Sequence, residues 1–213
     1  MKLSSYGCAE AQEPLVIILD DDASMCAAVS SLLRSVGMRV QIFNSAREIL
    51  DFDLPDVPSC LVLDVRLPGL GGLELQSQLN SIKVHLPIIF ITGHGDVPMT
   101  VKAMKAGAVD FLTKPFRDQD LLDAVSSAIE IDRKYRAYVS GRSAMVEHYA
   151  TLSGREQEVM GMAVCGLMNK QIADRLSLSE ITVKMHRAHA MQKMKARTFA
   201  DLVKMAEALS RDS

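Results

Sequence analysis

Five side chains in this sequence carry groups that could together accept a phosphoryl group. They are the carboxylates of Asp20, Asp21 and Asp64, the hydroxyl of Thr92 and the ammonium of Lys114. Clustered carboxylates repel one another, and oxygen ligands with room for water and phosphate suit Mg²⁺. A carboxylate beside such an ion can attack phosphorus, while the metal and a nearby lysine stabilise charge on the transferring oxygens. The five residues are therefore candidates for one phosphoryl-transfer site.

Apolar runs alternate with helical stretches over residues 15–130, and this alternation predicts how the five side chains meet. Strands are predicted at 15–19, 39–43, 60–63, 88–91 and 109–112. Helices are predicted at about 23–36, 45–51, 72–81, 97–105 and 118–135. Short apolar strands that alternate with helices indicate a parallel sheet covered on both faces. Because the candidate groups stand at or just after strand ends, they should converge at one edge of that sheet.

Each of these residues also has a structural explanation that involves no phosphoryl transfer. An aspartate at a strand end is often a helix N-cap, which would fit Asp20 or Asp22. Thr92 could be a turn residue before Gly93, and Lys114 a surface lysine before a proline. Four of the five predicted strand ends carry a matching group. A shared site is therefore the better interpretation of the whole set.

The order and spacing of these groups resemble the receiver domain of two-component response regulators. The matching motifs are Asp20-Asp21, Asp64-Val-Arg-Leu-Pro68 with Gly72, Thr92-Gly93, and Phe111-Leu-Thr-Lys114-Pro115-Phe116. The match extends over residues 14–130, and the segment ITGHGDVPMTVKAMKAGAVDF is similar to the FixJ subgroup in particular. The resemblance implies a flavodoxin-like (βα)5 fold and a sensor histidine kinase as phosphodonor.

The same resemblance implies a role for each acidic residue at the sheet edge. Asp64 would be the phosphoacceptor. The side chains of Asp21 and Asp64 and the backbone carbonyl of Arg66 would bind Mg²⁺, and Asp20 would help through water. These residues make up the implied metal site.

The resemblance further implies a conformational switch. Thr92 and Phe111 match the switch pair, and Lys114 matches a phosphate-binding lysine that precedes a cis bond to Pro115. On phosphorylation, Thr92 would move toward the phosphate and Phe111 would turn inward. The surface of the fourth helix, fifth strand and fifth helix would then change shape and let two receivers pair.

Charge is distributed unevenly along the chain, whose formal net charge is −2. Residues 1–130 carry 10 Lys/Arg and 17 Asp/Glu, whereas residues 151–213 carry 10 and 7. An acidic first part and a basic last part suggest a nucleic-acid surface in the last part. Helices are predicted there at about 154–165, 169–176, 180–195 and 199–209, with a capping box from Ser153 to Glu156 and caps at Ser179 and Thr198.

The predicted helix at 180–195 has two different faces. Its core-facing stripe would consist of Val183, the stem of Arg187, Ala190 and Met194. A short polar helix with small and cationic side chains can enter a major groove. The candidate contacts to bases or phosphates are Lys184, Met185, Arg187, Ala188, His189 and Lys193. On charge alone, a dimerisation hairpin with solvated lysines explains the helix equally well.

Residues 151–205 resemble the LuxR/NarL-type helix-turn-helix, which favours DNA binding. The hallmarks are Arg155-Glu156, Gly166-Leu167, Asn169-Lys170-Gln-Ile-Ala173, and Thr182-Val-Lys-Met-His186 followed by Lys193-Met194. The resemblance implies that the third helix, about 179–195, recognises DNA and that the fourth, about 198–209, dimerises. Two residues depart from the pattern: Gly154 replaces a usual Pro and Met168 a common Ser. Gly154 should loosen the start of its helix slightly.

These patterns predict two domains joined by a helical linker. Residues 1–130 would form the receiver, 131–150 the linker and 151–213 an all-α, four-helix DNA-binding domain. The linker would extend the fifth helix, with Ser140-Gly141 as a breaker. The chain starts without a secretory signal and contains no apolar run of about 18 residues, so we expect a cytoplasmic protein without a membrane span. The four cysteines fit no metal-ligand spacing.

The sequence thus predicts a transcription regulator rather than an enzyme, since the receiver would promote only its own phosphorylation and dephosphorylation. A sensor histidine kinase would phosphorylate Asp64 with Mg²⁺ as cofactor. The resulting homodimer would bind promoter DNA and act on RNA polymerase. An alternative is a haloacid-dehalogenase-type phosphohydrolase with Asp20 as nucleophile, but no later acidic pair follows Lys114. A third possibility is that the C-terminal domain binds RNA or another protein.

Overall fold

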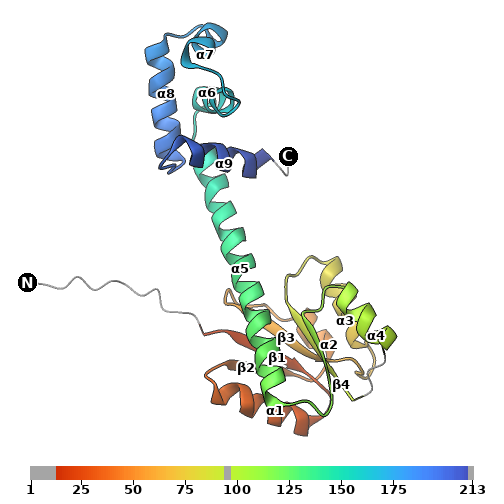
Figure 1. The fold of residues 1–213 in the computed structure, drawn as a ribbon. Helices are drawn as coiled ribbons and strands as arrows, with labels where there is room; N and C mark the ends of the chain where they lie inside the picture. Colours follow the sequence, from red (N-terminus) through yellow and green to blue (C-terminus); the bar gives the residue numbers. More distant parts are fainter. Residues whose placement is uncertain (1–12, 94–96, 211–213) are drawn as a thin grey trace, which may run out of the picture. The chain divides into compact units, whose positions relative to one another are not determined.

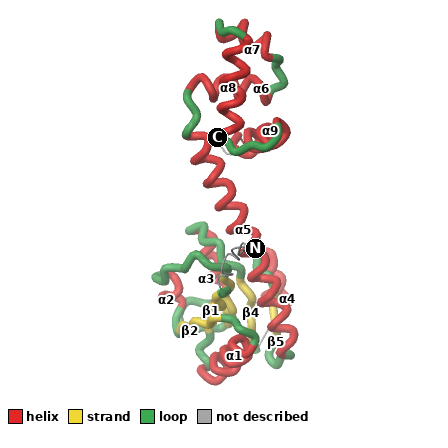
Figure 2. The backbone as a smooth tube through the Cα atoms, turned by 90° about the vertical axis from the view of Figure 1, so that its left-hand side faces the viewer, coloured by secondary structure: helices red, strands yellow, loops and turns green. Residues whose placement is uncertain are grey.

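The protein is described by a computed structural model, which covers residues 13–93 and 97–210. Its contacts divide the chain into two compact units, Met1–Arg136 and Ala137–Ser213. In Figure 2 the strands (yellow) of the described residues all lie in the first unit, and the second unit is drawn as helices and loops. The domain limits at residues 130 and 150 remain a prediction.

The first unit is built on a five-stranded parallel sheet (Figure 1). Its strands are β1 (Leu15–Leu19), β2 (Arg39–Phe43), β3 (Ser59–Asp64), β4 (Ile88–Thr92) and β5 (Asp110–Thr113). They lie in the order β2-β1-β3-β4-β5, and every neighbouring pair is parallel. This order confirms the predicted flavodoxin-like α/β fold. Each strand begins and ends within one residue of its predicted limits.

Helices cover both faces of the sheet, as the continuously apolar strands predict. They are α1 (Ala23–Ser35), α2 (Ala46–Leu50), α3 (Gly72–Ser81), α4 (Val97–Lys105) and α5 (Asp118–Ala150). Alternate strand residues divide between two cores. Leu63 and Phe90 pack with α2, α3 and α4, whereas Val62 and Ile91 pack with α1 and α5. Burial on both faces fixes the register of the strands and therefore the relative positions of their ends.

Helix α5 extends beyond the sheet. Its last buried residue is Asp132, and the helix continues without interruption to Ala150. The extension of the fifth helix is therefore present, but the break predicted at Ser140-Gly141 is wrong. A glycine inside a helix costs only about 1 kcal/mol relative to alanine, so the flanking helix can override it. Neither α5 nor any other helix in the described part of the chain is long and apolar enough to cross a membrane.

After α5, the described residues of the second unit form four short helices around two small cores. The helices are α6 (Gly154–Val164), α7 (Asn169–Leu176), α8 (Glu180–Lys193) and α9 (Phe199–Ser210). One core contains Leu152, Met160, Ala190, Met194 and Leu202, and the other contains Val159, Ala163, Ile172, Ala173 and Val183. Helix α8 contributes to both cores, so packing fixes which of its faces remains outside.

The predicted caps position these helices. Ser153 Oγ accepts the N–H of Glu156 at 3.3 Å, and Ser179 Oγ accepts the N–H of Thr182 at 3.1 Å. Thr198 Oγ1 accepts a backbone N–H in the first turn of α9 at 3.1 Å. Each hydroxyl satisfies one of the free N–H groups of a helix start.

Helix α7 begins without a side-chain cap. Its N-cap residue, Met168, has the extended backbone of a cap, with φ −74° and ψ 155°, but its side chain makes no cap hydrogen bond. The backbone N–H of Met168 donates to Gln171 Oε1 at 2.9 Å, so one half of a capping box is present. The N–H of Gln171 lacks the hydroxyl acceptor that a serine would offer.

Replacing Met168 with serine should stabilise the second unit by about 0.5–2 kcal/mol, because the new hydroxyl would accept the N–H of Gln171. The measurement is the urea concentration at which the second unit of the full chain has lost half of its helical signal. Met168→Ala removes the same exposed side chain without adding an acceptor and is the matched control. Equal midpoints for Met168→Ser and Met168→Ala would contradict the expectation.

Candidate functional site

Three acidic side chains meet where the order of the strands reverses. From the neighbouring strands β1 and β3, the sheet continues to β2 on one side and to β4 on the other. Ligands of open α/β sheets bind at such a switch point, beyond the carboxyl ends of the strands. Asp20 and Asp21 follow β1, and Asp64 ends β3. One carboxylate oxygen of each lies within 4.8 Å of the other two. The predicted convergence of these three residues is therefore present.

The three carboxylates form a site that can hold a metal ion. Asp20 and Asp64 are buried, whereas Asp21 is exposed. Acidic groups this close together repel one another unless a cation neutralises them, and the exposed member leaves space for water. The donor set consists of oxygen only, which suits a hard cation better than a thiophilic one.

Lys114 connects the two buried carboxylates. Its Nζ donates to Asp20 Oδ2 at 2.7 Å and to Asp64 Oδ2 at 2.9 Å. The lysine follows β5 and precedes a cis bond to Pro115, as the receiver resemblance implies. Burial alone would lower the pKa of Lys114, but its hydrogen bonds with Asp20 and Asp64 outweigh burial and raise the pKa. The ammonium therefore stays charged beside both carboxylates.

A tight turn after β3 holds Asp64 in place. The backbone N–H of Arg66 donates to Asp64 Oδ1 at 2.9 Å, and that of Gly72 donates to the carbonyl of Val65 at 3.0 Å. A Cβ on Gly72 would lie 2.4 Å from the carbonyl oxygen of Asp64. Only glycine thus lets α3 begin so close to the turn. The sequence motif includes Gly72 but does not reveal the close backbone approach that requires it. Metal binding by the carbonyl of Arg66 remains a prediction.

Thr92 and Phe111 lie on one face of the sheet. Phe111 pairs with Phe90 across β4 and β5, and Thr92 is two residues after Phe90 on β4. Residues two apart on a strand share a face. Thr92 is fully buried, and the partly buried ring of Phe111 lies 6.1 Å from that of Phe90. The two residues predicted to switch thus lie on a common face, and Thr92 follows Ile91, the pairing partner of Asp64 on β4.

Helix capping explains Asp22 rather than Asp20. Asp22 is the N-cap of α1, and its carboxylate accepts the N–H groups of Ser24 and Met25. Asp20 accepts the N–H of Asp22 through Oδ1 at 2.9 Å and the ammonium of Lys114 through Oδ2. The structural explanation considered for both residues therefore applies to Asp22, while Asp20 belongs to the acidic site.

The second candidate site is the outer face of α8. Lys184, Met185, Ala188 and His189 are all exposed. Their spacing places them on one side of the helix. The opposite side is buried through Val183, Ala190 and Met194. The two faces predicted for this helix are therefore confirmed.

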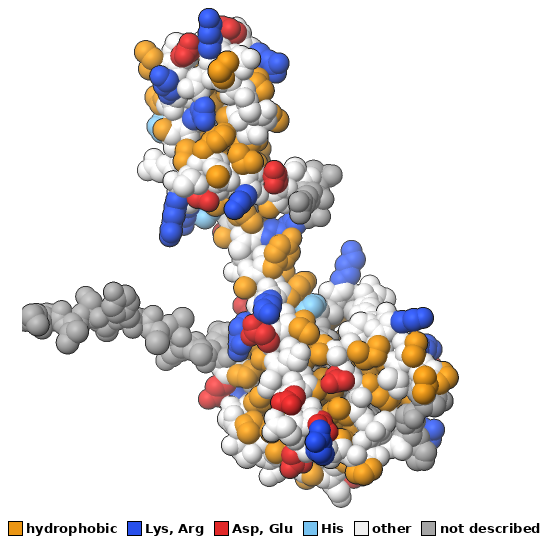
Figure 3. Space-filling view, viewed as in Figure 1, with side chains coloured by type: hydrophobic (Ala, Val, Ile, Leu, Met, Phe, Trp, Pro, Cys, Tyr) orange, Lys and Arg blue, Asp and Glu red, His pale blue; other side chains and the backbone are white. Residues whose placement is uncertain are grey.

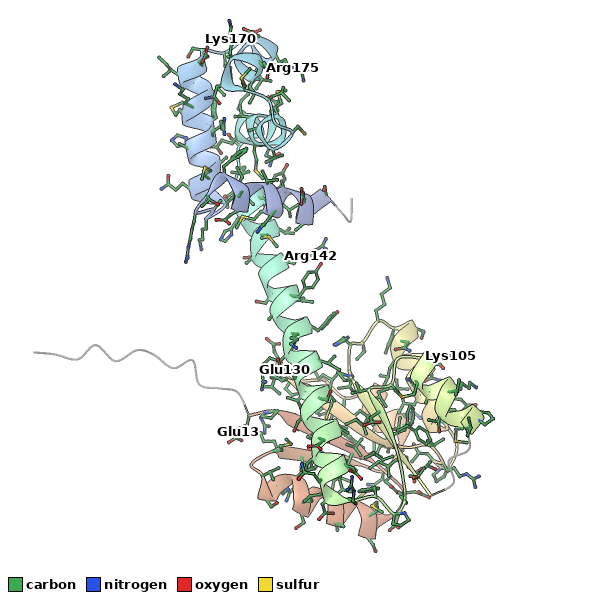
Figure 4. The ribbon with its side chains drawn as sticks, viewed as in Figure 1. Glu13, Lys105, Glu130, Arg142, Lys170 and Arg175 are labelled. Carbon is green, nitrogen blue, oxygen red and sulfur yellow. The ribbon has the colours of Figure 1, made fainter. Side chains whose placement is uncertain are left out.

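Further cations lie on the surface of the second unit. Figure 3 shows Lys and Arg side chains (blue) spread over the surface of the unit. Lys170 and Arg175 are exposed on the neighbouring α7, where Figure 4 labels them. Such charges can bind phosphates without reading sequence.

Two of the predicted DNA contacts are engaged inside the second unit. Arg187 Nη1 donates to Asn169 Oδ1 at 2.6 Å, and its guanidinium lies 4.8 Å from the centroid of the Phe199 ring. Lys193 Nζ donates to Glu156 Oε2 at 2.6 Å. These contacts connect α8 to α6, α7 and α9. Both cations therefore position α8, and any contact they make with DNA remains a prediction.

Glu156 is a buried anion whose importance the sequence analysis missed. Its side chain is about 5% exposed, and its Oε2 also accepts the N–H of Ser153 at 2.8 Å. His189 Nδ1 lies 3.5 Å from Oε1. The hydrogen bonds from Lys193 and then Ser153 lower the pKa of Glu156 to about 2. The sequence indicated only the local capping box, because the partner lysine comes from another helix.

The acidic site and the helical unit together define a class of protein, a receiver domain followed by a helix-turn-helix domain. Residues 16–126 match the model of the response regulator receiver domain, and residues 150–206 match that of bacterial regulatory proteins of the luxR family. The chain belongs to the two-component response regulators with a LuxR-type DNA-binding domain, which are transcription regulators. These matches do not favour the phosphohydrolase alternative with Asp20 as nucleophile.

Individual relatives agree with the family over nearly the whole chain. Nodulation protein W of Bradyrhizobium diazoefficiens is 57% identical, over 92% of this chain and 86% of that protein. The transcriptional regulatory protein FixJ of Azorhizobium caulinodans is 42% identical, over 90% of each. Among solved structures, the response regulator StyR is similar with a TM-score of 0.83 and 46% identity, covering 92% of this chain and 98% of that one.

Replacing Lys193 with methionine should destabilise the second unit at pH 7, because it leaves the buried carboxylate of Glu156 without its cation. The pKa of Glu156 is lowered by folding, so the stabilisation is complete above its ordinary value of 4.5 and is lost as the pH falls toward about 2. The difference in urea midpoint between wild type and Lys193→Met should therefore shrink between pH 7 and pH 3. Lys195→Met, which removes an exposed lysine, is the control; an undiminished difference at low pH would disprove the pairing.

Proposed function

We propose that a sensor histidine kinase transfers a phosphoryl group to Asp64, and that this step turns the chain into a DNA-binding homodimer. Residues 1–130 act as the phosphoacceptor domain, 131–150 as the linker and 151–213 as the DNA-binding domain. The observation that carries the proposal is the hydrogen bonding of Lys114 Nζ to both Asp20 and Asp64, which supports a single phosphoryl site. A kinase and promoter DNA as partners imply a cytoplasmic location.

The transfer is a nucleophilic attack by Asp64. Its carboxylate oxygen forms the new bond to phosphorus, the phosphorus–nitrogen bond of the kinase phosphohistidine breaks, and the electron pair leaves with the imidazole nitrogen. Bound Mg²⁺ would neutralise charge on the transferring oxygens. Asp21, Asp64 and the backbone carbonyl of Arg66 would hold the ion, and Asp20 would help through water. Lys114 keeps its proton and offers a second cation to the same oxygens.

Phosphorylation acts as a population switch. The added charge and oxygens attract Lys114 and the hydroxyl of Thr92, and Phe111 turns inward toward the space that Thr92 leaves. Moving an equilibrium from 1:99 to 99:1 needs about 5.5 kcal/mol of differential stabilisation. Charge-assisted contacts and a dimer interface together can supply this. Exposed apolar side chains on α4 support pairing through the surface of α4, β5 and α5: Val97, Val101 and Met104.

Paired second units then bind promoter DNA. Helix α8 enters the major groove and presents Lys184, Met185, Ala188 and His189 to base edges and nearby phosphates. Two copies address two half-sites separated by one helical turn or a multiple of it. Arg187 and Lys193 hold α8 in position for these contacts through Asn169, Phe199 and Glu156. The DNA-bound dimer acts on RNA polymerase to change transcription.

Asp64→Asn should abolish phosphorylation by a small phosphodonor such as acetyl phosphate, because an amide oxygen is a poor nucleophile toward phosphorus. Intact-mass measurement would detect one added phosphoryl group on wild type and none on the variant. Chelation of Mg²⁺ should suppress the modification of wild type as well. Asp53→Asn, at an exposed aspartate away from the site, is the control. Undiminished modification of Asp64→Asn would refute the assignment of the acceptor.

Lys184→Ala and Lys193→Ala should weaken DNA binding in different ways. An exposed lysine that contacts a phosphate releases a counterion, so Lys184→Ala should reduce the slope of log affinity against log salt by about 0.9 per copy. Lys193 is bonded to Glu156, so Lys193→Ala should lower affinity while leaving the slope unchanged. Gel shifts at several salt concentrations measure both quantities. A reduced slope for Lys193→Ala would show instead that this lysine leaves Glu156 for DNA.

A further inference from the structure

An apolar stripe runs along the outer face of α8. Ile181, the second residue of this helix, is 79% exposed and is the most exposed of the large apolar side chains that the structure describes. Met185 follows one turn later and is 48% exposed. Residues four apart in a helix lie on the same side, so the two side chains are neighbours. The exposed Lys184 lies beside them.

The start of α8 gives Ile181 no packing role. The helix is capped by Ser179, whose hydroxyl accepts the N–H of Thr182. A hydrophobic staple joins the residue before the cap to the fourth residue of a helix. Leu178 and Val183 occupy these two positions, and both pack in the same small core. Ile181 belongs to neither core of the second unit.

Helix formation does not explain Ile181 either. A β-branched side chain loses rotamer freedom in a helix, so isoleucine is a poorer helix former than alanine, leucine or glutamate. The preceding Glu180 does have a local explanation, because a carboxylate in the first turn interacts favourably with the helix dipole. A single exposed apolar residue is ordinary on a protein surface. Here, however, two of them form one stripe on the helix that is proposed to enter DNA.

The major groove offers one apolar group to such a stripe. Among the groups that distinguish the base pairs there, only the C5 methyl of thymine is apolar, and the others are hydrogen-bond donors or acceptors. The N-terminal residues of a helix-turn-helix recognition helix are those that contact base edges. Ile181 stands at that end of α8 and has no group with which to hydrogen-bond a base or a phosphate.

We propose that Ile181 recognises the C5 methyl of a thymine in each half-site, with Met185 shielding the contact from water. This inference rests on the proposed DNA binding and deepens it, because it names the feature of the DNA that α8 reads. The contact removes the isoleucine side chain and the thymine methyl from water together. Lys184 contributes affinity through phosphates, which carry no sequence information, whereas the methyl contact selects thymine.

The test begins with selection of duplexes from a random synthetic library by the full wild-type chain, treated with acetyl phosphate and Mg²⁺. In such a library only thymine carries a C5 methyl. Each thymine of the selected half-site is then replaced in turn by deoxyuridine, which pairs in the same way and lacks only the methyl. At one position or more, the replacement should weaken wild-type binding about fourfold, the effect of one buried methyl group.

The variant Ile181→Ala removes the contact and retains the helix. At the position where deoxyuridine weakens wild-type binding, this variant should bind the thymine and deoxyuridine duplexes equally well. Because the side chain is exposed and alanine is the better helix former, the helical signal should match that of wild type. Val146→Ala is the matched control. It removes a β-branched side chain that is 49% exposed on α5, and it should keep the fourfold difference.

The methyl contact and DNA binding itself can fail separately. If Ile181→Ala is as sensitive to deoxyuridine as wild type at every thymine, Ile181 does not read the methyl. The same conclusion follows if wild-type binding is insensitive to deoxyuridine throughout, or if the selected half-sites contain no thymine. If no sequence is selected at all, the proposed DNA binding is refuted, and the methyl contact with it.

Discussion

The contact on which the first unit depends is the double hydrogen bond from Lys114 to Asp20 and Asp64. The carboxyl ends of β1, β3 and β5 are brought together by one ammonium group. Without a cation, the two buried carboxylates would repel each other in a place that water reaches poorly. The sheet supplies the geometry, because parallel strands in fixed register bring their carboxyl ends to a common edge. Charge and topology thus support each other at this edge.

Strand β3 has polar contacts of opposite character at its two ends. At its carboxyl end, Asp64 contacts Lys114 and lies beside buried Asp20 and exposed Asp21. At its start, the N–H of Ser59 is held by Asp132 in a dry cluster. All six residues between and including these ends are buried. A side-chain carboxylate therefore anchors each end of this buried strand, at opposite edges of the sheet.

Most of the fold could be predicted from the sequence, because it follows from local patterns. Apolar periodicity indicates the strand limits and the two faces of α8, and residue type indicates the helix caps. The acidic site could be predicted because its members stand at strand ends, where topology alone brings them together. Three features could not. The helix continues through Ser140-Gly141 because flanking residues override a local breaker, and no sequence pattern connects Asp132 to Ser59 or Glu156 to Lys193. Such pairings depend on tertiary packing between distant segments.

The engagement of Arg187 and Lys193 inside the second unit has a consequence for how strongly one copy can hold a duplex. Fewer free cations on α8 mean that fewer counterions are displaced from the phosphate backbone. The electrostatic part of the DNA affinity of a single copy is therefore small. Two copies on adjacent half-sites would add their exponents in the salt dependence, so their joint occupancy would rise much more steeply than that of either one. A modest cationic surface would thereby make DNA binding depend on the presence of two copies.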